Sequence, residues 1–166
     1  KADSYVRWGS IMKNWSAQTH GQFHFGLYDE TGQLEAHIDD DGLEVFVIEP
    51  EPLPLGVWHH VAFVADGSLL HLYRNGKEVA TAPYQSIAQR PDVRPLLIGN
   101  KHYTGKLTND AIQYWNGRLD ELALFYHALD ADSIKELYEA GLQWDFEEEA
   151  RVDGFESKVQ SPEPES

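Results

Sequence analysis

Two histidines are the first residues whose types and spacing point to chemistry. His24 and His37 lie in two predicted strands of one hairpin, and its register makes them cross-strand neighbours on the polar face, close enough to share a metal ion. Zinc needs a third and a fourth ligand, and Glu35 or Asp39 would have to move in. Because this ligand spacing is not a recognised zinc pattern, two exposed imidazoles are the favoured interpretation.

The segment Asn100–Asn116 holds the other candidate chemistry, which is the binding of a sugar. It predicts a polar, aromatic-bearing loop that is long for a compact domain, and such loops are often functional. Sugar faces stack on exposed aromatic rings, while a few placed polar groups fix the orientation of the ligand. The candidate ligand-binding residues are Tyr103, Asn109, Asp110, Gln113 and Tyr114.

The composition limits the partners. The 166 residues carry a net charge of −15, so nucleic acid and anionic membrane surfaces would repel the chain. No apolar run is long enough to span a bilayer and no signal peptide is visible, so we expect no direct membrane insertion. The lack of cysteine excludes disulfides and thiolate metal sites but leaves the compartment open. The chain starts at Lys1 without a methionine, which is typical of a cut-out domain or a mature fragment.

Hydrophobic alternation predicts the hairpin that would position the two histidines. Residues 22–28 and 33–38 alternate between apolar and polar side chains and are separated by a break at residues 29–32. A one-residue slip would place Glu35 opposite Leu27, so the apolar face fixes the register. The predicted pairs are Leu27 with Leu34, Phe25 with Ala36 and Phe23 with Ile38.

A second hairpin and further strands complete the expected β-structure. Asn75-Gly76 predicts a type I′ turn, which requires positive φ at both positions. Three prolines in residues 49–55 exclude a central strand there. The turn predicts the pairs Tyr73 with Glu78 and Leu72 with Val79. The other predicted strands are Ser10–Trp15, Leu43–Ile48, Trp58–Val64, Leu69–Arg74, a short buried Pro95–Gly99 and a long Arg118–Tyr126.

A helix and an acidic tail follow. Asp130 is the expected N-cap of a short helix that buries Ile134, Leu137 and Tyr138 and stops at Gly141. Residues 142–166 hold eight acids against two basic residues and end in S-P-E-P-E-S. We expect an acidic, largely disordered tail, with the option of adding one edge strand to the sandwich.

An ordered series of motifs resembles the laminin G-like jelly-roll domain of the concanavalin A-like lectin/glucanase superfamily. The series is W-H-H-V-A, L-Y-R-N-G-K, L-I-G, N-G-R-L-D-E-L and A-L-D-A-D-S-I-K-E-L-Y, and the resemblance covers residues 10–141. It implies an all-β, two-sheet antiparallel sandwich with one short helix near the C-terminus, spanning residues 1–141. The family usually opens with a further strand or two, for which only Tyr5–Trp8 is available here. Either the N-terminal edge is trimmed and the sandwich is smaller than usual, or part of Leu142–Val159 fills the gap. It also implies that Trp58 and Trp115 are core residues, and that the protein is extracytoplasmic or at the cell surface.

Calcium is the cofactor that the resemblance implies, because many members hold it at the rim of the sandwich. Calcium takes six to eight oxygen ligands. Asp39, Asp41 and Asp110 are the candidate ligands, since residues 39–42 place three carboxylates in one turn. A solvated acidic turn without an ion is the alternative.

The superfamily also includes glycosidases, whose two carboxylates lie on one strand face as E-x-D-x-E or E-x-D-x-x-E. The chain contains no E-x-D, and Asp120 and Glu121 are adjacent, so on a strand they point to opposite faces. We therefore expect no catalytic residues and no enzyme. Asp120 is interpreted as structural, accepting backbone N–H bonds from a neighbouring loop.

These observations predict a non-catalytic binding module within a larger protein. Its ligand would be a carbohydrate or a protein surface reached by the rim loops, and the isolated domain would be monomeric. A structural spacer without a ligand is the alternative, and a glycoside hydrolase relative is a third possibility that lacks a catalytic pair.

Overall fold

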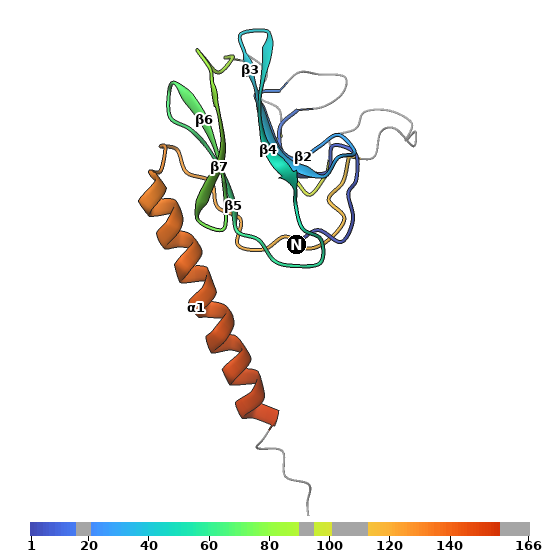
Figure 1. Cartoon of the computed structure of the whole chain (residues 1–166), viewed down its shortest axis with the longest axis vertical. Helices are drawn as coiled ribbons and strands as arrows, with labels where there is room; N and C mark the ends of the chain where they lie inside the picture. Colours follow the sequence, from blue (N-terminus) through green and yellow to red (C-terminus); the bar gives the residue numbers. More distant parts are fainter. Residues whose placement is uncertain (16–20, 90–94, 101–112, 157–166) are drawn as a thin grey trace, which may run out of the picture.

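The structure of the chain is a computed structural model that describes residues 1–15, 21–89, 95–100 and 113–156, with side chains described as far as Gln143 in the last range. Its strands are β1 (Ser10–Lys13), β2 (Phe23–Tyr28), β3 (Gln33–Asp40), β4 (Leu43–Pro52), β5 (Val61–Ala65), β6 (Leu69–Arg74), β7 (Lys77–Pro83) and β8 (Leu97–Ile98). They form two antiparallel sheets, of order β4-β3-β2-β1-β8 and β5-β6-β7, which face each other in Figure 1. The predicted two-sheet antiparallel sandwich is confirmed.

The hairpin of β2 and β3 has the register that the apolar alternation predicts. Phe23 pairs with Ile38, and His24 pairs with His37. The two other predicted pairs, Phe25 with Ala36 and Leu27 with Leu34, are also present. The apolar residues of this hairpin belong to the core cluster between the sheets. Because side chains alternate along a strand, His24 and His37 lie on the opposite face of the sheet.

The core joins the two sheets through large apolar side chains. Leu34 from the larger sheet and Leu70 and Leu72 from the smaller one are all fully buried. The rings of Phe25 and Phe63 lie 6.1 Å apart across the same interface. Burying one leucine side chain contributes about 1.5–3 kcal/mol, so this layer is the main source of stability.

The turn between β6 and β7 has the predicted type I′ character, because φ is 53° at Asn75 and 72° at Gly76. Tyr73 pairs with Glu78 as predicted. The prediction for the next pair is wrong, because an irregularity between Leu72 and Tyr73 shifts the register so that Leu72 pairs with Ala80 instead of Val79.

β4 runs through the first prolines of residues 49–55, to Pro52, and is longer than the predicted Leu43–Ile48. It lies at the edge of the larger sheet, where proline removes no ladder hydrogen bond to a further strand. The exclusion of a central strand from this segment is therefore confirmed.

Two predicted strands differ from the structure. β8 is not buried, since Ile98 is 51% exposed at the edge of the larger sheet. Residues 118–126 form no strand, and Tyr126 is fully exposed. The backbone of Arg118 donates to the Lys1 carbonyl, and Glu121 has φ 49°, a left-handed conformation that interrupts an extended chain.

The helix α1 (Ala131–Glu156) begins as predicted and ends much later. The Asp130 carboxylate accepts the Ser133 N–H at 2.8 Å, and Ile134 is buried. Leu137 is 42% exposed, because only the first turns of the helix meet the smaller sheet before the helix projects away from it (Figure 1). Gly141 is not among the glycines with positive φ, so the predicted stop there is wrong.

The acidic tail is only partly described. Residues 142–156 continue the helix, because one interior glycine costs about 1 kcal/mol and helix-forming residues follow it. The expected disorder and the optional edge strand therefore do not hold for these residues. Residues 157–166 lie outside the described residues, and the division into a 1–141 domain and a 142–166 tail stays a prediction.

Candidate functional site

A pocket of about 150 Å³ opens on the face of the larger sheet that points away from the smaller one. A cavity of roughly this size can hold one six-membered ring. The lining residues come from the sheet, from the segments before and after β1, and from the chain just after the undescribed residues 101–112. They are Trp8, Lys13, Trp15, His24, His37, Glu44, Phe46 and Gln113.

The floor of the pocket is a row of four cross-strand neighbours. Lys13 on β1 pairs with His24 on β2, which pairs with His37 on β3, which pairs with Phe46 on β4. Antiparallel pairing aligns these side chains on one face of the sheet. The register that fills the core with apolar residues therefore also assembles this row.

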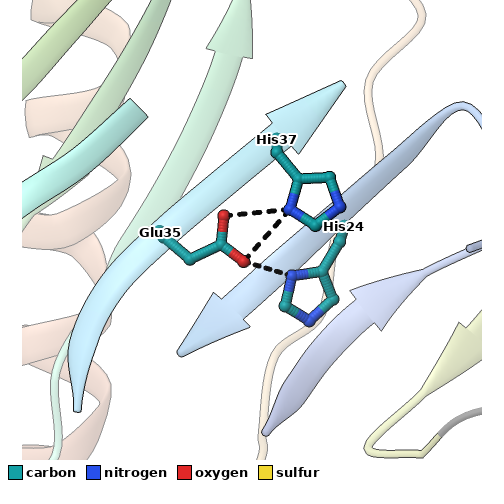
Figure 2. Close-up of side chains that lie close together, drawn as sticks. All are labelled: His24, Glu35 and His37. Carbon is teal, nitrogen blue, oxygen red and sulfur yellow. Dashed lines mark hydrogen bonds and ion pairs between the residues drawn. The ribbon is translucent and has the colours of Figure 1, made fainter. Parts of the chain in front are cut away.

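Glu35 lies beside the row, two residues before His37 and on the same face of β3. Its carboxylate is fully buried and contacts both imidazoles, as Figure 2 shows. His24 Nδ1 lies in very close contact with Glu35 Oε1, and His37 Nδ1 lies 3.3 Å from Oε1 and 3.2 Å from Oε2. On the far side of the ring, His24 Nε2 lies 3.2 Å from the Ser10 hydroxyl.

The burial of this cluster shifts its protonation. Burial alone would raise the pKa of Glu35, but hydrogen bonds and charge from His24 and His37 outweigh it and hold the pKa below 4.5. Burial lowers the pKa of His24 below 6.5, against the opposing effect of Glu35. At neutral pH the cluster therefore holds an ionised carboxylate and a neutral His24 imidazole.

Aromatic rings form the walls of the pocket around His37. The His37 ring centroid lies 6.2 Å from that of Trp8, 5.0 Å from that of Trp15 and 4.7 Å from that of Phe46. Trp8 has φ 55°, an uncommon conformation for a bulky side chain, and its N–H donates to the Asp29 carbonyl at 3.1 Å. Backbone strain of this kind often persists at functional sites.

A buried lysine connects the pocket floor to the predicted ligand loop. Lys13 is 2% exposed, and its Nζ donates to Gln113 Oε1 at 2.8 Å. Burying an ammonium group is costly unless it is hydrogen-bonded, so Gln113 helps to hold Lys13 in place. The end of the predicted loop thus reaches the pocket.

The predicted ligand-binding residues are only partly described. Gln113 lines the pocket, whereas Tyr114 is 42% exposed and is not part of the lining. Tyr103, Asn109 and Asp110 lie outside the described residues. The ligand site in this loop stays a prediction.

The candidate calcium ligands have other partners or lie outside the described residues. Asp39 is buried, and its Oδ1 accepts the Gly42 N–H at 2.6 Å. Asp41 is exposed in a left-handed conformation, and Asp110 is not described. The calcium site therefore stays a prediction.

Of the predicted structural residues, the turn residues and Trp115 are placed as expected. Trp115 is 9% exposed, belongs to the core cluster and donates its indole N–H to the Lys1 carbonyl at 3.1 Å. Trp58 is 50% exposed, so the prediction of a core tryptophan is wrong; it precedes β5 and lies outside both sheets. Asp120 is exposed and accepts the N–H of its neighbour Glu121 at 2.9 Å, so the expected bonds from another loop are absent among the described residues.

The interpretation of His24 and His37 as exposed is also wrong, since they are 2% and 6% exposed. The alternation of β3 places Glu35 and His37 on one face, and this signal is present in the sequence. The burial comes from Trp8 and Trp15, which lie outside the hairpin, and hairpin periodicity contains no information about them.

Comparisons with known proteins give the fold family. A family model described as the concanavalin A-like lectin/glucanases superfamily matches residues 1–135. A native heptameric SAP-like pentraxin from Limulus polyphemus superposes with a TM-score of 0.57 at 20% identity, covering 80% of this chain and 64% of that one. An S-layer domain-containing protein (residues 221–444) from Clostridium thermocellum ATCC 27405 matches with a TM-score of 0.42 at 22% identity, covering 81% and 66%.

These matches have clear limits. The chain spans slightly less than two thirds of the length of either solved structure, and the pentraxin likeness concerns the fold alone. No curated protein matches the chain. Among the described helical residues, none belongs to a helix with the length and apolar character needed to cross a membrane.

Proposed function

The chain belongs to the concanavalin A-like lectin/glucanase superfamily, and we propose that it is a non-catalytic module that binds a carbohydrate in the pocket on the outer face of its larger sheet. The observation that carries this proposal is the combination of three aromatic rings with a row of polar side chains in one hollow. Ligand sites generally combine an apolar platform with a few convergent polar groups. A superfamily of this kind hosts many functions, so the site and not the fold carries the proposal.

The polar groups of the pocket suit a neutral sugar. Lys13 offers donors, Glu44 offers acceptors, and the amide of Gln113 offers both. The volume of about 150 Å³ suits one terminal ring better than an extended oligosaccharide. The net charge of −15 disfavours strongly anionic sugars.

Glu35 and Glu44, the glutamates in the described part of the chain around the pocket, do not have the arrangement of a glycosidase pair. Glu44 pairs with Asp39, four residues along β3 from Glu35, which is about 13 Å at the usual rise per residue. Retaining enzymes hold their two carboxyl groups about 5–5.5 Å apart and inverting ones about 6.5–9.5 Å apart. Glu35 is also buried beneath two imidazoles. These features support a binding role.

We further propose that the module is monomeric and serves a larger extracytoplasmic or cell-surface protein. A protein ligand is the second candidate, favoured by the exposed apolar side chains of residues 122–126. These are Leu122, Leu124, Phe125 and Tyr126. A spacer without any ligand remains the alternative to both.

A glycan array tests the proposal, with wild type, Trp15→Ala and Trp58→Ala each screened in calcium and in EDTA. Trp15 lines the pocket, whereas Trp58 is half exposed outside it, so the two variants are a matched pair. We expect wild type to bind a glycan, Trp15→Ala to weaken binding by at least about tenfold, or 1.4 kcal/mol, and Trp58→Ala to match wild type. A blank array in both buffers would overturn the carbohydrate proposal. Loss of glycan binding in Trp58→Ala alone would place the carbohydrate site outside the pocket.

A further inference from the structure

Three side chains on the outer face of β2 and β3 offer a metal ion a prepared donor set. His24, Glu35 and His37 are all buried, and one ligand atom from each lies within 4.8 Å of the others. Figure 2 shows both imidazoles turned toward the carboxylate, each through Nδ1. We propose that these three residues bind a divalent transition-metal ion of the zinc class.

The donor types select this class of ion. Two imidazole nitrogens and one carboxylate oxygen form a common three-residue zinc set, with a fourth position left for water or another ligand. Calcium takes six to eight oxygens and magnesium favours oxygen ligands and water, so neither suits this set. Imidazole suits zinc, copper, iron and nickel.

The distances need only a small adjustment. Two ligands bound at about 2.0–2.2 Å to a tetrahedral ion lie roughly 3.4 Å apart. His37 Nδ1 lies 3.2–3.3 Å from the two oxygens of Glu35, which is close to that separation. His24 Nδ1 is closer than this to Glu35 Oε1 and would have to move outward.

Ser10 lies on the side of the His24 ring that points away from Glu35. The Ser10 hydroxyl donates its one hydrogen to the Trp8 carbonyl at 3.1 Å. His24 Nε2 lies 3.2 Å from the same hydroxyl. The other ring nitrogen, Nδ1, faces the Glu35 carboxylate, and a metal ion bound there would replace the hydrogen between the two groups.

The residues around His24 affect metal binding in two ways. Ser10 acts as a partner behind the ligand, because a bond to the far nitrogen of a histidine fixes its ring and tautomer for metal binding. The charge of Lys13 opposes any cation, so the ion must gain most of its affinity from direct coordination.

His24 and His37 also line the pocket, so an ion that they bind would lie next to the proposed ligand site. Metal binding itself does not rest on the proposed carbohydrate function and is measurable without any sugar. A protein that binds a glycan but no zinc would leave the proposed function intact while the metal site failed. A protein that binds zinc but no glycan would show the reverse, so the two failures are distinguishable.

Titration of chelator-treated protein with zinc alone is the first test, followed by the visible spectrum of the protein with cobalt(II). We expect one ion per chain, an increase in melting temperature on adding zinc, and a cobalt spectrum typical of four-coordinate nitrogen and oxygen ligation. Wild type that binds no zinc and shows no change in melting temperature would overturn the proposal, and this outcome requires no variant.

The variants His37→Gln and His71→Ala locate the ion. His71 lies between Asp66 and Glu78 on the surface and is the natural place for adventitious binding. We expect affinity to fall roughly 100-fold or more in His37→Gln, since loss of even an outer partner costs 10–100-fold, and to stay unchanged in His71→Ala. If His71→Ala no longer binds one zinc ion per chain while His37→Gln still does, the ion lies at the surface site around His71, and the proposal is overturned.

Discussion

The two faces of β3 are both buried, but by different means. Leu34 and Ile38 face the smaller sheet with apolar side chains, and each is at most 1% exposed. Glu35, His37 and Asp39 face the other way and are at most 6% exposed, although all three are polar. The first face is covered by the second layer of the sandwich, and the second is partly covered by the aromatic rings around the pocket.

The comparison separates residues that stabilise the fold from residues that add little to its stability. The apolar face gains free energy with each side chain removed from water. The polar face gains little, because a buried polar group must recover its lost hydration through hydrogen bonds. The outer face of an antiparallel sheet is usually polar and meets water, so the unusual feature of this face is that its polar side chains are buried.

The largest expected effect on stability comes from a substitution on the face of β3 that points into the core. Leu34→Ala removes a fully buried side chain and should lower the free energy of unfolding by about 2–5 kcal/mol, through lost transfer free energy and the cavity left behind. Denaturant unfolding measures it. Leu124→Ala is the matched control, since Leu124 is 70% exposed and its loss should cost less than about 0.5 kcal/mol. Equal losses in the two variants would contradict the placement of the core.

Replacing Glu35 tests the polar face. Glu35→Ala removes the acceptor of both His24 and His37 and should cost about 2 kcal/mol, because two buried imidazoles lose a partner but can remain neutral. Denaturant unfolding in EDTA measures the protein contribution without metal. The exposed Glu30 supplies the control variant Glu30→Ala, for which we expect no measurable loss. If Glu35→Ala is as stable as wild type, the polar cluster contributes nothing to the fold.

The parts of the fold that local rules govern could be predicted from the sequence. The register of β2 and β3 follows from apolar alternation, and the turn at Asn75 and Gly76 follows from the need for positive φ. The superfamily, too, follows from the ordered motifs. Each of these signals lies within a few residues of the feature that it determines.

Features set by distant contacts were not predictable in the same way. Residues 118–126 have strand-like alternation, yet bonds from Arg118 to the N-terminus and the left-handed Glu121 prevent a strand. The helix passes Gly141 because nothing at that position requires positive φ. The candidate site belongs to this group, since Trp8 and Gln113 reach His24 and His37 from segments far away in the chain.

The smallest expected effect is on the pH dependence of stability, which should differ between the buried His24 of the polar face and the surface residue His71. The pKa of His24 is below its ordinary 6.5 in the folded protein, mainly through burial. At pH values between the pKa of His24 in the folded protein and 6.5, the unfolded chain binds a proton at His24 that the folded protein does not. The free energy of unfolding therefore falls as the pH drops below about 6.5. Glu35, whose pKa lies below 4.5, adds a further loss only as the pH drops below about 4.5. Denaturant midpoints in EDTA at pH 7.5, 6.5 and 5.5 should therefore decrease in that order, and His24→Gln should make that slope shallower. His59 and His60, whose pKa values burial also lowers below 6.5, add to the slope with the same sign.

His71 gives the contrast, because its shift has the opposite sign. Its partial burial lowers the pKa, but hydrogen bonds to Glu78 and Asp66 outweigh this and raise the pKa above 6.5. The contribution of His71 to the free energy of unfolding is present below pH 6.5 and is lost as the pH rises through the pKa of His71 in the folded protein. This contribution is small because His71 is partly exposed to solvent. His71→Ala should therefore make the loss of stability on acidification slightly steeper, while His24→Gln makes it shallower. The same change of slope in both variants would mean that His24 titrates like a surface histidine, and the buried polar face would then not set the pH response.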